Sequence, residues 1–356
     1  MISEQDKYYM QRCLQLAQIG LGNTYPNPMV GSVIVHNGKI IGEGYHTQSG
    51  MPHAEVNAIN SVKDKSLLKS STLYVNLEPC SHFGKTPPCS LHIRQMGIPR
   101  VVIGCRDTFS EVDGRGIEHL KAHGISVTTG VLEQESRELN RRFFTFHEKK
   151  RPYIILKWAQ TKDGFIDKLR PSDAPKQPTW ISDPRTRQLV HKWRAEEPSI
   201  LIGSKTALAD NPSLTTRDWF GAHPLRLVVD REGLLPHTMS LFSGDAPTVI
   251  YTHNNSIKYP NAESVIVNTN QSIVSEITND LFNRNIQSLV VEGGTQLIEL
   301  FIKQGMWDEA RVIVGNKWFG NGLKAPFLNH DPLSSTPFSN DTILYFRNHN
   351  SHKLNI

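Results

Sequence analysis

The stretch EPCSHFGKTPPC, residues 78–89, contains two of the four cysteines in this chain. Cys80 and Cys89 are separated by eight residues, which is too wide for the C-x-x-C pair of a zinc ribbon or a thioredoxin-like redox motif. Upstream, PHAEVNAI begins a predicted helix that carries His53 and Glu55. His-x-Glu, followed by Pro-Cys and a second cysteine, is typical of zinc deaminases, although the usual gap between their cysteines is two residues.

The chemistry of a zinc deaminase explains why these residue types occur together. A catalytic zinc takes three protein ligands and keeps one position for water. We expect His53, Cys80 and Cys89 to be those ligands, with one zinc per chain. Zinc acidifies the water, and Glu55 is predicted to carry protons from it to the leaving amine. Two alternatives stay open: His82 closes the site as the fourth ligand of a structural zinc, or the cysteines are unrelated thiols.

The segments around this motif predict an α/β domain over residues 1–146. Strands alternate with helices, which indicates a central sheet with helices packed on it. The first two strands are joined by Asn37-Gly38, a strong hairpin signal. Cys13, on the apolar face of the opening helix, and Cys105 are expected in the core. The predicted strands are 30–36, 39–46, 71–77, 100–104 and 125–130, and the predicted helices are 10–21, about 53–62, 88–97 and 116–124.

A second α/β domain is predicted over residues 152–356, after a polar linker at about 147–151. Its predicted strands are 153–159, 199–203, 225–230, 247–252, 288–294 and 310–315, and its predicted helices are 184–195, 272–282 and 295–305. The segment after about residue 329 is rich in Asn, Ser and Pro and is left unassigned.

Two features of this second domain point to chemistry. SLVVEGGTQLIELF runs strand, Gly-Gly turn, helix, which lets a phosphate approach backbone amides at a helix N-terminus. The turn lacks the G-x-G-x-x-G pattern, so an ordinary Rossmann dehydrogenase is not expected. Lys157 lies inside an apolar strand, where an unpaired charge would be costly. The alternative is an edge residue that extends its amine into solvent.

Composition and charge exclude several classes of protein. The 356 residues include 39 Lys and Arg against 34 Asp and Glu, with no basic run longer than three. A nucleic-acid deaminase would need a basic groove with stacking aromatic residues, which this pattern does not indicate. No apolar run approaches the roughly 18 residues of a membrane helix, and the first twenty residues do not resemble a signal peptide. Four cysteines are too few for a disulfide scaffold, so a reducing cytoplasm is expected.

Specific motifs resemble one enzyme family. YPNPMVG, GEGYH, PHAE, LEPCSHFGKTPPC and GCRD resemble the deaminase half of the bifunctional riboflavin-biosynthesis deaminase/reductases, and LKWAQTKDG, WIS, LIGSKTALADNPSLTTR, LRLVVD and VEGGTQL resemble the reductase half. The resemblance implies a cytidine-deaminase-like α/β/α sandwich followed by a dihydrofolate-reductase-like α/β domain. It implies zinc-dependent deamination of a diaminopyrimidinone that carries a ribosylamino 5′-phosphate, then NADPH reduction of the ribosyl chain to a ribityl chain. A homodimer through the reductase domain is also implied.

The resemblance further implies site residues. Those expected on the deaminase substrate are Asn27, His46, Lys85 and Asp107. Those expected on the reductase substrate are Pro178, Arg194, Leu214, Arg217 and Glu292. Those expected on the nicotinamide cofactor are Gln160, Trp180, Thr206, Asp210, Arg231, Gly294, Thr295, Gln296, Leu297, Ile298, Glu299 and Leu300. Lys157 and Asp210 are the candidates for polarising the reacting carbon or relaying a proton.

Five residues at four sites depart from the family pattern. Lys85 stands where arginine is usual, which keeps the charge but loses the bidentate fork. Thr161-Lys162 replaces Ser-Leu, and Asn211 replaces an aspartate that is often present. Arg231 stands where most members have a smaller residue. We expect Arg231 to pair with the 2′-phosphate of NADPH, and a solvated turn residue is the alternative.

Overall fold

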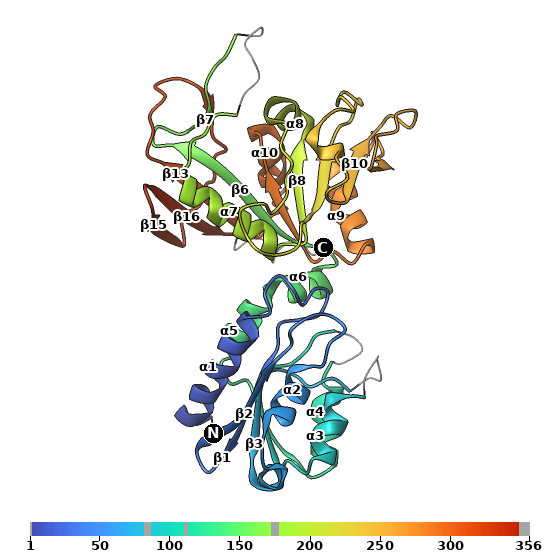
Figure 1. Cartoon of the computed structure of the whole chain (residues 1–356), viewed down its shortest axis with the longest axis vertical. Helices are drawn as coiled ribbons and strands as arrows, with labels where there is room; N and C mark the ends of the chain where they lie inside the picture. Colours follow the sequence, from blue (N-terminus) through green and yellow to red (C-terminus); the bar gives the residue numbers. More distant parts are fainter. Residues whose placement is uncertain (1, 82–86, 110–112, 172–177, 349–356) are drawn as a thin grey trace. The chain divides into compact units, whose positions relative to one another are not determined.

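The protein consists of two compact units, Met1–Lys150 and Arg151–Ile356, drawn from blue to green and from green to red in Figure 1. The computed structural model describes residues 2–81, 87–109, 113–171 and 178–348. His82 and Lys85, two residues considered for the deaminase site, lie outside these ranges. Among the described residues, no helix combines the length and apolar character that crossing a membrane requires.

The N-terminal unit is an α/β/α sandwich, as the resemblance implied. Its sheet has the strand order β2-β1-β3-β4-β5, with β1 antiparallel to both neighbours and β3, β4 and β5 parallel. One face packs on α1 through a cluster that includes Met10 and Cys13, and the other packs on α2, α3 and α4 through Ile59, Ile93 and Leu120. The elements are α1 (Glu4–Gln18), β1 (Gly31–His36), β2 (Lys39–Tyr45), α2 (Ala54–Ser61), the 3-10 helix η1 (Lys65–Ser70), β3 (Thr72–Leu77), α3 (Cys89–Gln95), β4 (Arg100–Cys105), α4 (Arg115–Ala122), β5 (Ser126–Thr129), α5 (Glu133–Leu139) and α6 (Arg141–Lys149).

Local sequence explains how the first elements form. The turn between β1 and β2 has positive φ at both central residues, 47° at Asn37 and 74° at Gly38, which asparagine and glycine tolerate best. Ser3 caps α1 by accepting the amide of Asp6. Cys13 and Cys105 are buried, as predicted, at 0% and 1% exposure. Among the described residues, Cys80 and Cys89 are the two cysteines that lie close together: the backbone amide of Cys89 donates to Cys80 Sγ at 3.3 Å.

The C-terminal unit is built on a sheet of nine strands in the order β11-β10-β9-β8-β12-β6-β13-β16-β15. The strands from β11 to β13 are parallel, and β16 and β15 are antiparallel additions at one edge. Helices α9 and α10 pack on one face, and α7 and α8 on the other (Figure 1). The elements are β6 (Tyr153–Thr161), β7 (Phe165–Asp167), α7 (Pro184–Glu196), β8 (Ser199–Gly203), α8 (Ser204–Asp210), β9 (Leu225–Val229), the 3-10 helix η2 (Ser240–Phe242), β10 (Thr248–Thr252), β11 (Glu263–Ile266), α9 (Ile273–Asn283), β12 (Ser288–Glu292), α10 (Thr295–Lys303), β13 (Glu309–Gly315), β14 (Leu323–Lys324), β15 (Ser334–Phe338) and β16 (Asp341–Arg347).

The segment expected to be a polar linker, residues 147–151, contains the end of helix α6 and the boundary between the two compact units. Helix α6 continues to Lys149, and its buried residues include Phe143, Phe144 and Phe146. Arg151 is buried, and its guanidinium nitrogens lie 2.6 and 2.8 Å from the carboxylate oxygens of Asp308. The boundary therefore falls within the expected linker, although the first residues of that linker belong to a helix that buries three phenylalanines.

Within the segment after residue 329, which had no predicted elements, residues 334–347 form the hairpin β15–β16. Strand β16 pairs with β13 and buries Ile343 and Phe346, whereas all five residues of β15 are exposed at the edge of the sheet. An edge strand that contains Pro337 and polar residues carries little hydrophobic pattern, so its sequence gave no strand signal.

Candidate active sites

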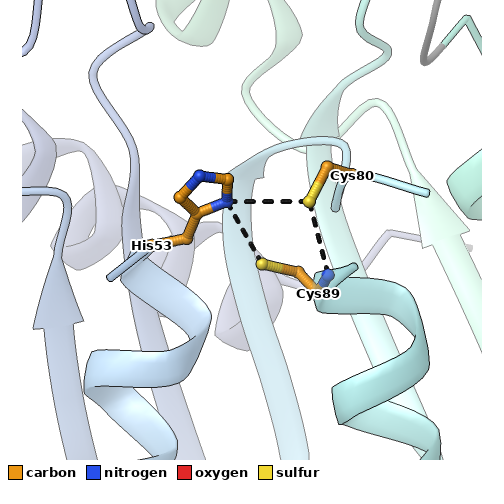
Figure 2. A group of neighbouring side chains, drawn as sticks. All are labelled: His53, Cys80 and Cys89. Carbon is orange, nitrogen blue, oxygen red and sulfur yellow. Dashed lines mark hydrogen bonds between the residues drawn. The ribbon is translucent and has the colours of Figure 1, made fainter. Parts of the chain in front are cut away.

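Three potential zinc ligands converge at the ends of three segments of the N-terminal unit. His53 is the N-cap of α2, with extended backbone at φ −71° and ψ 164°. Cys89 is the first residue of α3, and Cys80 follows β3. Figure 2 shows the imidazole of His53 and the two sulfurs facing one another. The α/β topology thus brings together residues that are up to 36 positions apart in the chain.

The donor atoms have the spacing that a single zinc requires. His53 Nδ1 lies 3.6 Å from Cys80 Sγ and 3.3 Å from Cys89 Sγ. Nitrogen and sulfur ligands of one tetrahedral zinc should be separated by about 3.6 Å, given the usual metal–ligand bond lengths. Within the described residues, this is the one group of three or more His, Cys, Asp or Glu whose donor atoms lie within 4.8 Å of one another. Two thiolates and an imidazole suit zinc.

Glu55 lies beside this cluster and is suited to transfer protons. It stands in the first turn of α2 and is 3% exposed. Burial raises its pKa to about 7, and the charge of Cys80 adds to that rise while His53 opposes it. A carboxyl group with a pKa near neutrality accepts and releases a proton at comparable cost. The Cys80 thiol has its pKa lowered to about 4, chiefly by its hydrogen bond with Cys89, which favours a thiolate.

Two of the expected substrate residues lie next to the potential ligands. Asn27 Nδ2 is 3.0 Å from His46 Nε2, and the His46 ring packs edge-on against the ring of His53 with centroids 5.4 Å apart. His46 Nδ1 also lies 3.2 Å from the carbonyl oxygen of Pro52. The amide of Asn27 is therefore held by the same histidine that contacts His53.

Asp107 was also expected to contact the deaminase substrate, and it is buried at 5% exposure. Its Oδ1 accepts the amide of Phe109 at 2.8 Å. Burial raises its pKa to about 7; the Phe109 amide opposes this, and the negative charges of Glu78 and Cys80 add to it. Asp107 therefore belongs to the same electrostatic environment as the potential zinc ligands.

Glu78 is a site residue that sequence analysis missed. Its carboxylate, 4% exposed, accepts four backbone N–H groups: those of Asp107 and Gly114 on Oε2, and those of Gly116 and Ile117 on Oε1. The available signal was an acidic residue directly after a buried strand, where a charge needs partners.

In the C-terminal unit, the structure brings together three residues that were expected to act on the substrate. Lys157 and Glu292 are register partners on the neighbouring parallel strands β6 and β12. Lys157 Nζ lies 3.5 Å from Glu292 Oε2, and Arg194 Nη2 of α7 lies 3.0 Å from the same oxygen. Each of the three side chains is 10–14% exposed. Lys157 is therefore an ion-paired residue of an inner strand, and the edge interpretation is wrong.

The electrostatics of this trio keep its carboxylate ionised. Burial alone would raise the pKa of Glu292, but Arg194 and Lys157 outweigh it and lower the pKa to about 2. Burial and the charge of Arg194 lower the pKa of Lys157, while Glu292 opposes the change. Lys157 thus holds its proton less firmly than a solvated lysine does.

The expected cofactor residues Thr206 and Gly294 are in direct contact. Gly294 donates its amide to Thr206 Oγ1 at 2.8 Å, and Gly293 has a φ of 113°. A Cβ on Gly293 would lie 2.9 Å from the same hydroxyl oxygen, so the turn depends on glycine. At the neighbouring strand end, a Cβ on Gly203 would have no heavy atom within 4 Å. Gly203 therefore faces open space at the carboxyl edge of the sheet, which leaves room there for a cofactor phosphate.

The residues of α10 that were expected on the cofactor differ in how exposed they are. Gln296 and Glu299 are exposed, Thr295 and Leu300 are half-buried, and Leu297 and Ile298 are buried in the core at 9% and 0%. Thr295 Oγ1 donates to the carbonyl oxygen of Lys324 at 2.9 Å. Ile298 packs inside the hydrophobic core of the unit, so its side chain does not face a cofactor. The first turn of α10 is the part that remains available for one.

Asp210, the second candidate for proton relay, belongs to a different group of charges. It ends α8 and keeps an exposed surface, yet the surrounding protein removes part of its hydration and, with Asp167 nearby, raises its pKa. Arg170 opposes that rise. Among the described residues, Asp210 has no hydrogen bond or ion pair with Lys157 or Glu292.

Other expected cofactor and substrate residues are half-buried or exposed. Gln160 Oε1 accepts the indole N–H of Trp158 at 2.8 Å. Trp180 is 51% exposed, and the guanidinium carbon of Arg187 lies 4.3 Å from its ring centroid. Pro178 and Arg231 are exposed.

Two departures from the family pattern have structural explanations. Asn211 has a φ of 41° and ψ of 52°, a left-handed conformation that asparagine tolerates well, and its Oδ1 accepts the amide of Ser240 at 2.8 Å. Lys162 is exposed, so its charge is solvated. Neither residue introduces an uncompensated buried charge.

The loop after α8 carries Leu214 and Arg217, which were expected on the substrate. Leu214 is 2% exposed with a φ of 54°, and Arg217 is exposed and donates to Ser213 Oγ at 3.1 Å. Arg226, which sequence analysis missed, is fully buried beneath this loop and donates to the carbonyl oxygens of Ser213 at 3.1 Å and Ala246 at 2.6 Å. A buried arginine thus fixes the backbone beside Arg217.

Comparisons with known proteins agree with both halves of this description. The family model described as the cytidine and deoxycytidylate deaminase zinc-binding region matches residues 3–105, and the RibD C-terminal domain matches residues 152–344. Riboflavin biosynthesis protein RibD of Aquifex aeolicus is 40% identical, with 91% of this chain and 90% of that protein covered. RibD of Escherichia coli is 35% identical, with 90% of each covered.

Solved structures give the same result. A crystal structure from Thermotoga maritima, titled a diaminohydroxyphosphoribosylaminopyrimidine deaminase/5-amino-6-(5-phosphoribosylamino)uracil reductase, is 36% identical with a TM-score of 0.88 and covers 97% of this chain and 99% of its own. RibD of Acinetobacter baumannii is 30% identical, with a TM-score of 0.86 and the same coverage. With a zinc-type donor set in one unit and a reductase fold in the other, the chain belongs to the RibD family of bifunctional riboflavin-biosynthesis enzymes and combines a zinc deaminase with an NADPH-dependent reductase.

Proposed function

We propose that the deaminase unit acts on 2,5-diamino-6-ribosylamino-4(3H)-pyrimidinone 5′-phosphate and that the reductase unit converts the ribosyl chain of the deaminated product to a ribityl chain. The observation that carries this proposal is the convergence of His53, Cys80 and Cys89 beside the buried Glu55. The named activity of the Thermotoga maritima relative, which is similar over 97% of this chain, supports the choice of substrate.

In the deaminase unit, we assign the metal to His53, Cys80 and Cys89. A zinc ion bound there would supply Lewis-acid activation of the attacking water. Glu55 accepts a proton during attack on the ring carbon and donates one to the departing amine, which its pKa of about 7 permits. Asn27, fixed by His46, offers an amide that hydrogen-bonds the pyrimidine ring, and Asp107 offers a carboxyl group to the ribose.

In the reductase unit, we assign Lys157, Glu292 and Arg194 to the reacting end of the substrate. NADPH supplies the hydride. Lys157 donates a proton to the oxygen or nitrogen at which negative charge develops, and its lowered pKa makes this proton easier to release. Glu292 holds Lys157 and Arg194 in one geometry. Arg217 is suited to the substrate phosphate because guanidinium groups pair with phosphate oxygens in a bidentate manner, whereas Arg194 directs its Nε and Nη2 at Glu292.

The direct test is to incubate the purified protein with the phosphorylated diaminopyrimidinone and to follow the ultraviolet spectrum. We expect ammonia release without NADPH, and NADPH consumption only after deamination. A spectrum that stays unchanged with zinc-loaded protein would contradict the assigned substrate. A nucleic-acid deaminase would instead release ammonia from single-stranded DNA or RNA, which serves as the comparison substrate.

The zinc assignment predicts how the metal content changes in variants. Wild-type protein should contain one zinc per chain, and Cys89→Ser should lose most of it because a ligand with a strong preference for zinc is gone. Cys105→Ala removes a buried thiol that is not in the cluster and serves as the control. Zinc is measured by atomic emission on purified protein. Loss of zinc from His82→Ala would indicate a closed site with four ligands and would contradict a catalytic metal.

The cofactor assignment predicts a change in NADPH preference. Arg231, exposed after β9, is suited to pair with the 2′-phosphate of NADPH. If bound NADPH shields Arg231 from water, the charge-assisted contact contributes about 1.5–3 kcal/mol to binding. If the pair stays exposed, it contributes only about 0–1 kcal/mol. We expect Arg231→Ala to raise the Michaelis constant for NADPH about tenfold and to leave that for NADH nearly unchanged. Steady-state kinetics with both cofactors decides, and equal effects on the two would exclude the contact.

Location and assembly are the remaining parts of the proposal. A cytoplasmic location is consistent with four free cysteines, two of which are the proposed thiolate ligands that oxidation would threaten. A homodimer through the reductase unit follows from the resemblance to the family, and light scattering of the purified protein measures it. The even spread of a net charge of +5 supports a small-molecule substrate and no nucleic-acid partner.

A further inference from the structure

Glu78 connects the segments that form the deaminase site. It follows β3 and precedes the proposed zinc ligand Cys80 by two residues. Its Oε2 accepts the amides of Asp107 at 3.2 Å and Gly114 at 3.1 Å. Its Oε1 accepts two amides at the start of α4, which lie at 3.0 and 3.2 Å. One buried carboxylate therefore joins the strand end before Cys80, the segment that carries Asp107, and the N-terminus of α4.

The backbone around Glu78 is packed closely enough to transmit its position. Glu78 donates its own amide to the carbonyl oxygen of Cys105 at 3.0 Å. Gly116 packs against Pro79, the residue that follows Glu78. A Cβ on Gly116 would lie 2.0 Å from the carbonyl oxygen of Pro79. The carbonyl oxygen of Cys80 in turn accepts the amide of Ser90 at 3.1 Å. A shift of the Glu78 carboxylate would consequently move the segment that carries Asp107.

We propose that Glu78 is a positioning residue of the deaminase, which fixes Asp107 in the orientation that binds the substrate. The inference rests on the proposed contact of Asp107 with the substrate. Glu78 does not touch the substrate itself in this assignment, since both of its oxygens are occupied by backbone amides. Its effect passes through the backbone N–H of Asp107.

A glutamine at position 78 is the sharpest test because it keeps the shape and removes one acceptor. The amide oxygen should stay at the N-terminus of α4, where the helix dipole favours negative charge. The NH₂ group would then face the N–H groups of Asp107 and Gly114, which are donors as well. We expect Glu78→Gln to raise the Michaelis constant for deamination about tenfold while the turnover number changes less than about threefold.

Three controls define what the change in Michaelis constant means. Glu118→Gln removes the same charge from an exposed side chain in the first turn of α4 and should leave the Michaelis constant unchanged. Zinc content should stay at one per chain, and NADPH reduction of supplied intermediate should be unaltered. If Glu78→Gln gives little folded protein, Glu78→Asp replaces it: the shorter side chain keeps both oxygens but draws them away from Asp107, so the Michaelis constant should also rise.

A double variant separates positioning from an independent effect. If Glu78 acts through Asp107, Asp107→Asn alone should raise the Michaelis constant at least as much, and adding Glu78→Gln should raise it no further. Additive effects, or a loss of turnover and thermal stability at an unchanged Michaelis constant, would overturn the inference. An unchanged Michaelis constant in Asp107→Asn would refute the substrate contact itself, and the positioning role with it. An unchanged value in Glu78→Gln alone would refute only the positioning role.

Discussion

Replacing Glu55 with glutamine is expected to reduce deamination by a factor of about 10²–10⁴, the usual contribution of a positioned acid or base. Glu55 is 3% exposed beside His53, Cys80 and Cys89, so bulk water does not easily replace it as a proton carrier. Glutamine has nearly the same shape but cannot accept and release a proton near neutral pH. Ammonia release from the phosphorylated diaminopyrimidinone measures the loss.

The same variant contains its own controls. Glu55 is not among the three proposed zinc ligands, so the zinc content of Glu55→Gln should equal that of the wild type. The reductase lies in the other compact unit, and reduction of supplied deaminated intermediate should proceed at the normal rate. If both activities fall while circular dichroism shows an intact fold, the assignment of one reaction to each unit is wrong.

Lys157→Met should produce the opposite result, with reduction lowered by about 10²–10⁴ and deamination unchanged. Methionine is similar in length and has no proton to donate. Arg194 lies 3.0 Å from Glu292, so the carboxylate should stay compensated without Lys157 and the unit should remain folded. Single-turnover oxidation of NADPH with the deaminated intermediate isolates the chemical step from product release.

Two further variants decide how to interpret that result. Lys162→Met removes an exposed lysine from the same chain segment and should change neither activity. Asp210→Asn tests the competing candidate, which lies among Asp167 and Arg170 rather than beside Glu292. Normal reduction in Lys157→Met, together with a large loss in Asp210→Asn, would transfer the proton-relay role to Asp210.

Local sequence predicted the convergence of the three potential zinc ligands for identifiable physical reasons. His53, Cys80 and Cys89 each stand at the end of an element, and zinc chemistry limits the possible partners of two thiolates. The hairpin at Asn37-Gly38 is likewise encoded by the two residues of its turn. In such cases a few side chains determine the structure without help from distant parts of the chain.

Features that depend on distant partners were not predictable in the same way. Glu78 and Arg226 are functional candidates because of the backbone groups that fold around them, and their neighbours in sequence do not indicate those contacts. Lys157 could not be distinguished from a solvated lysine until the register of β6 and β12 placed it beside Glu292. The strand β15 forms because β16 offers it an edge, although its own five residues are all exposed.

The buried pair of Arg151 and Asp308 bears on where the coding sequence of the reductase unit should begin if that unit is produced alone. Arg151 is the first residue of the C-terminal unit, and its guanidinium reaches Asp308 across 157 positions of sequence. A reductase that starts at Pro152 lacks that guanidinium and changes the environment of a buried carboxylate. A reductase that starts at Arg151 keeps it. The boundary between the two compact units falls between residues 150 and 151, so a chain cut there leaves this buried pair within the C-terminal unit.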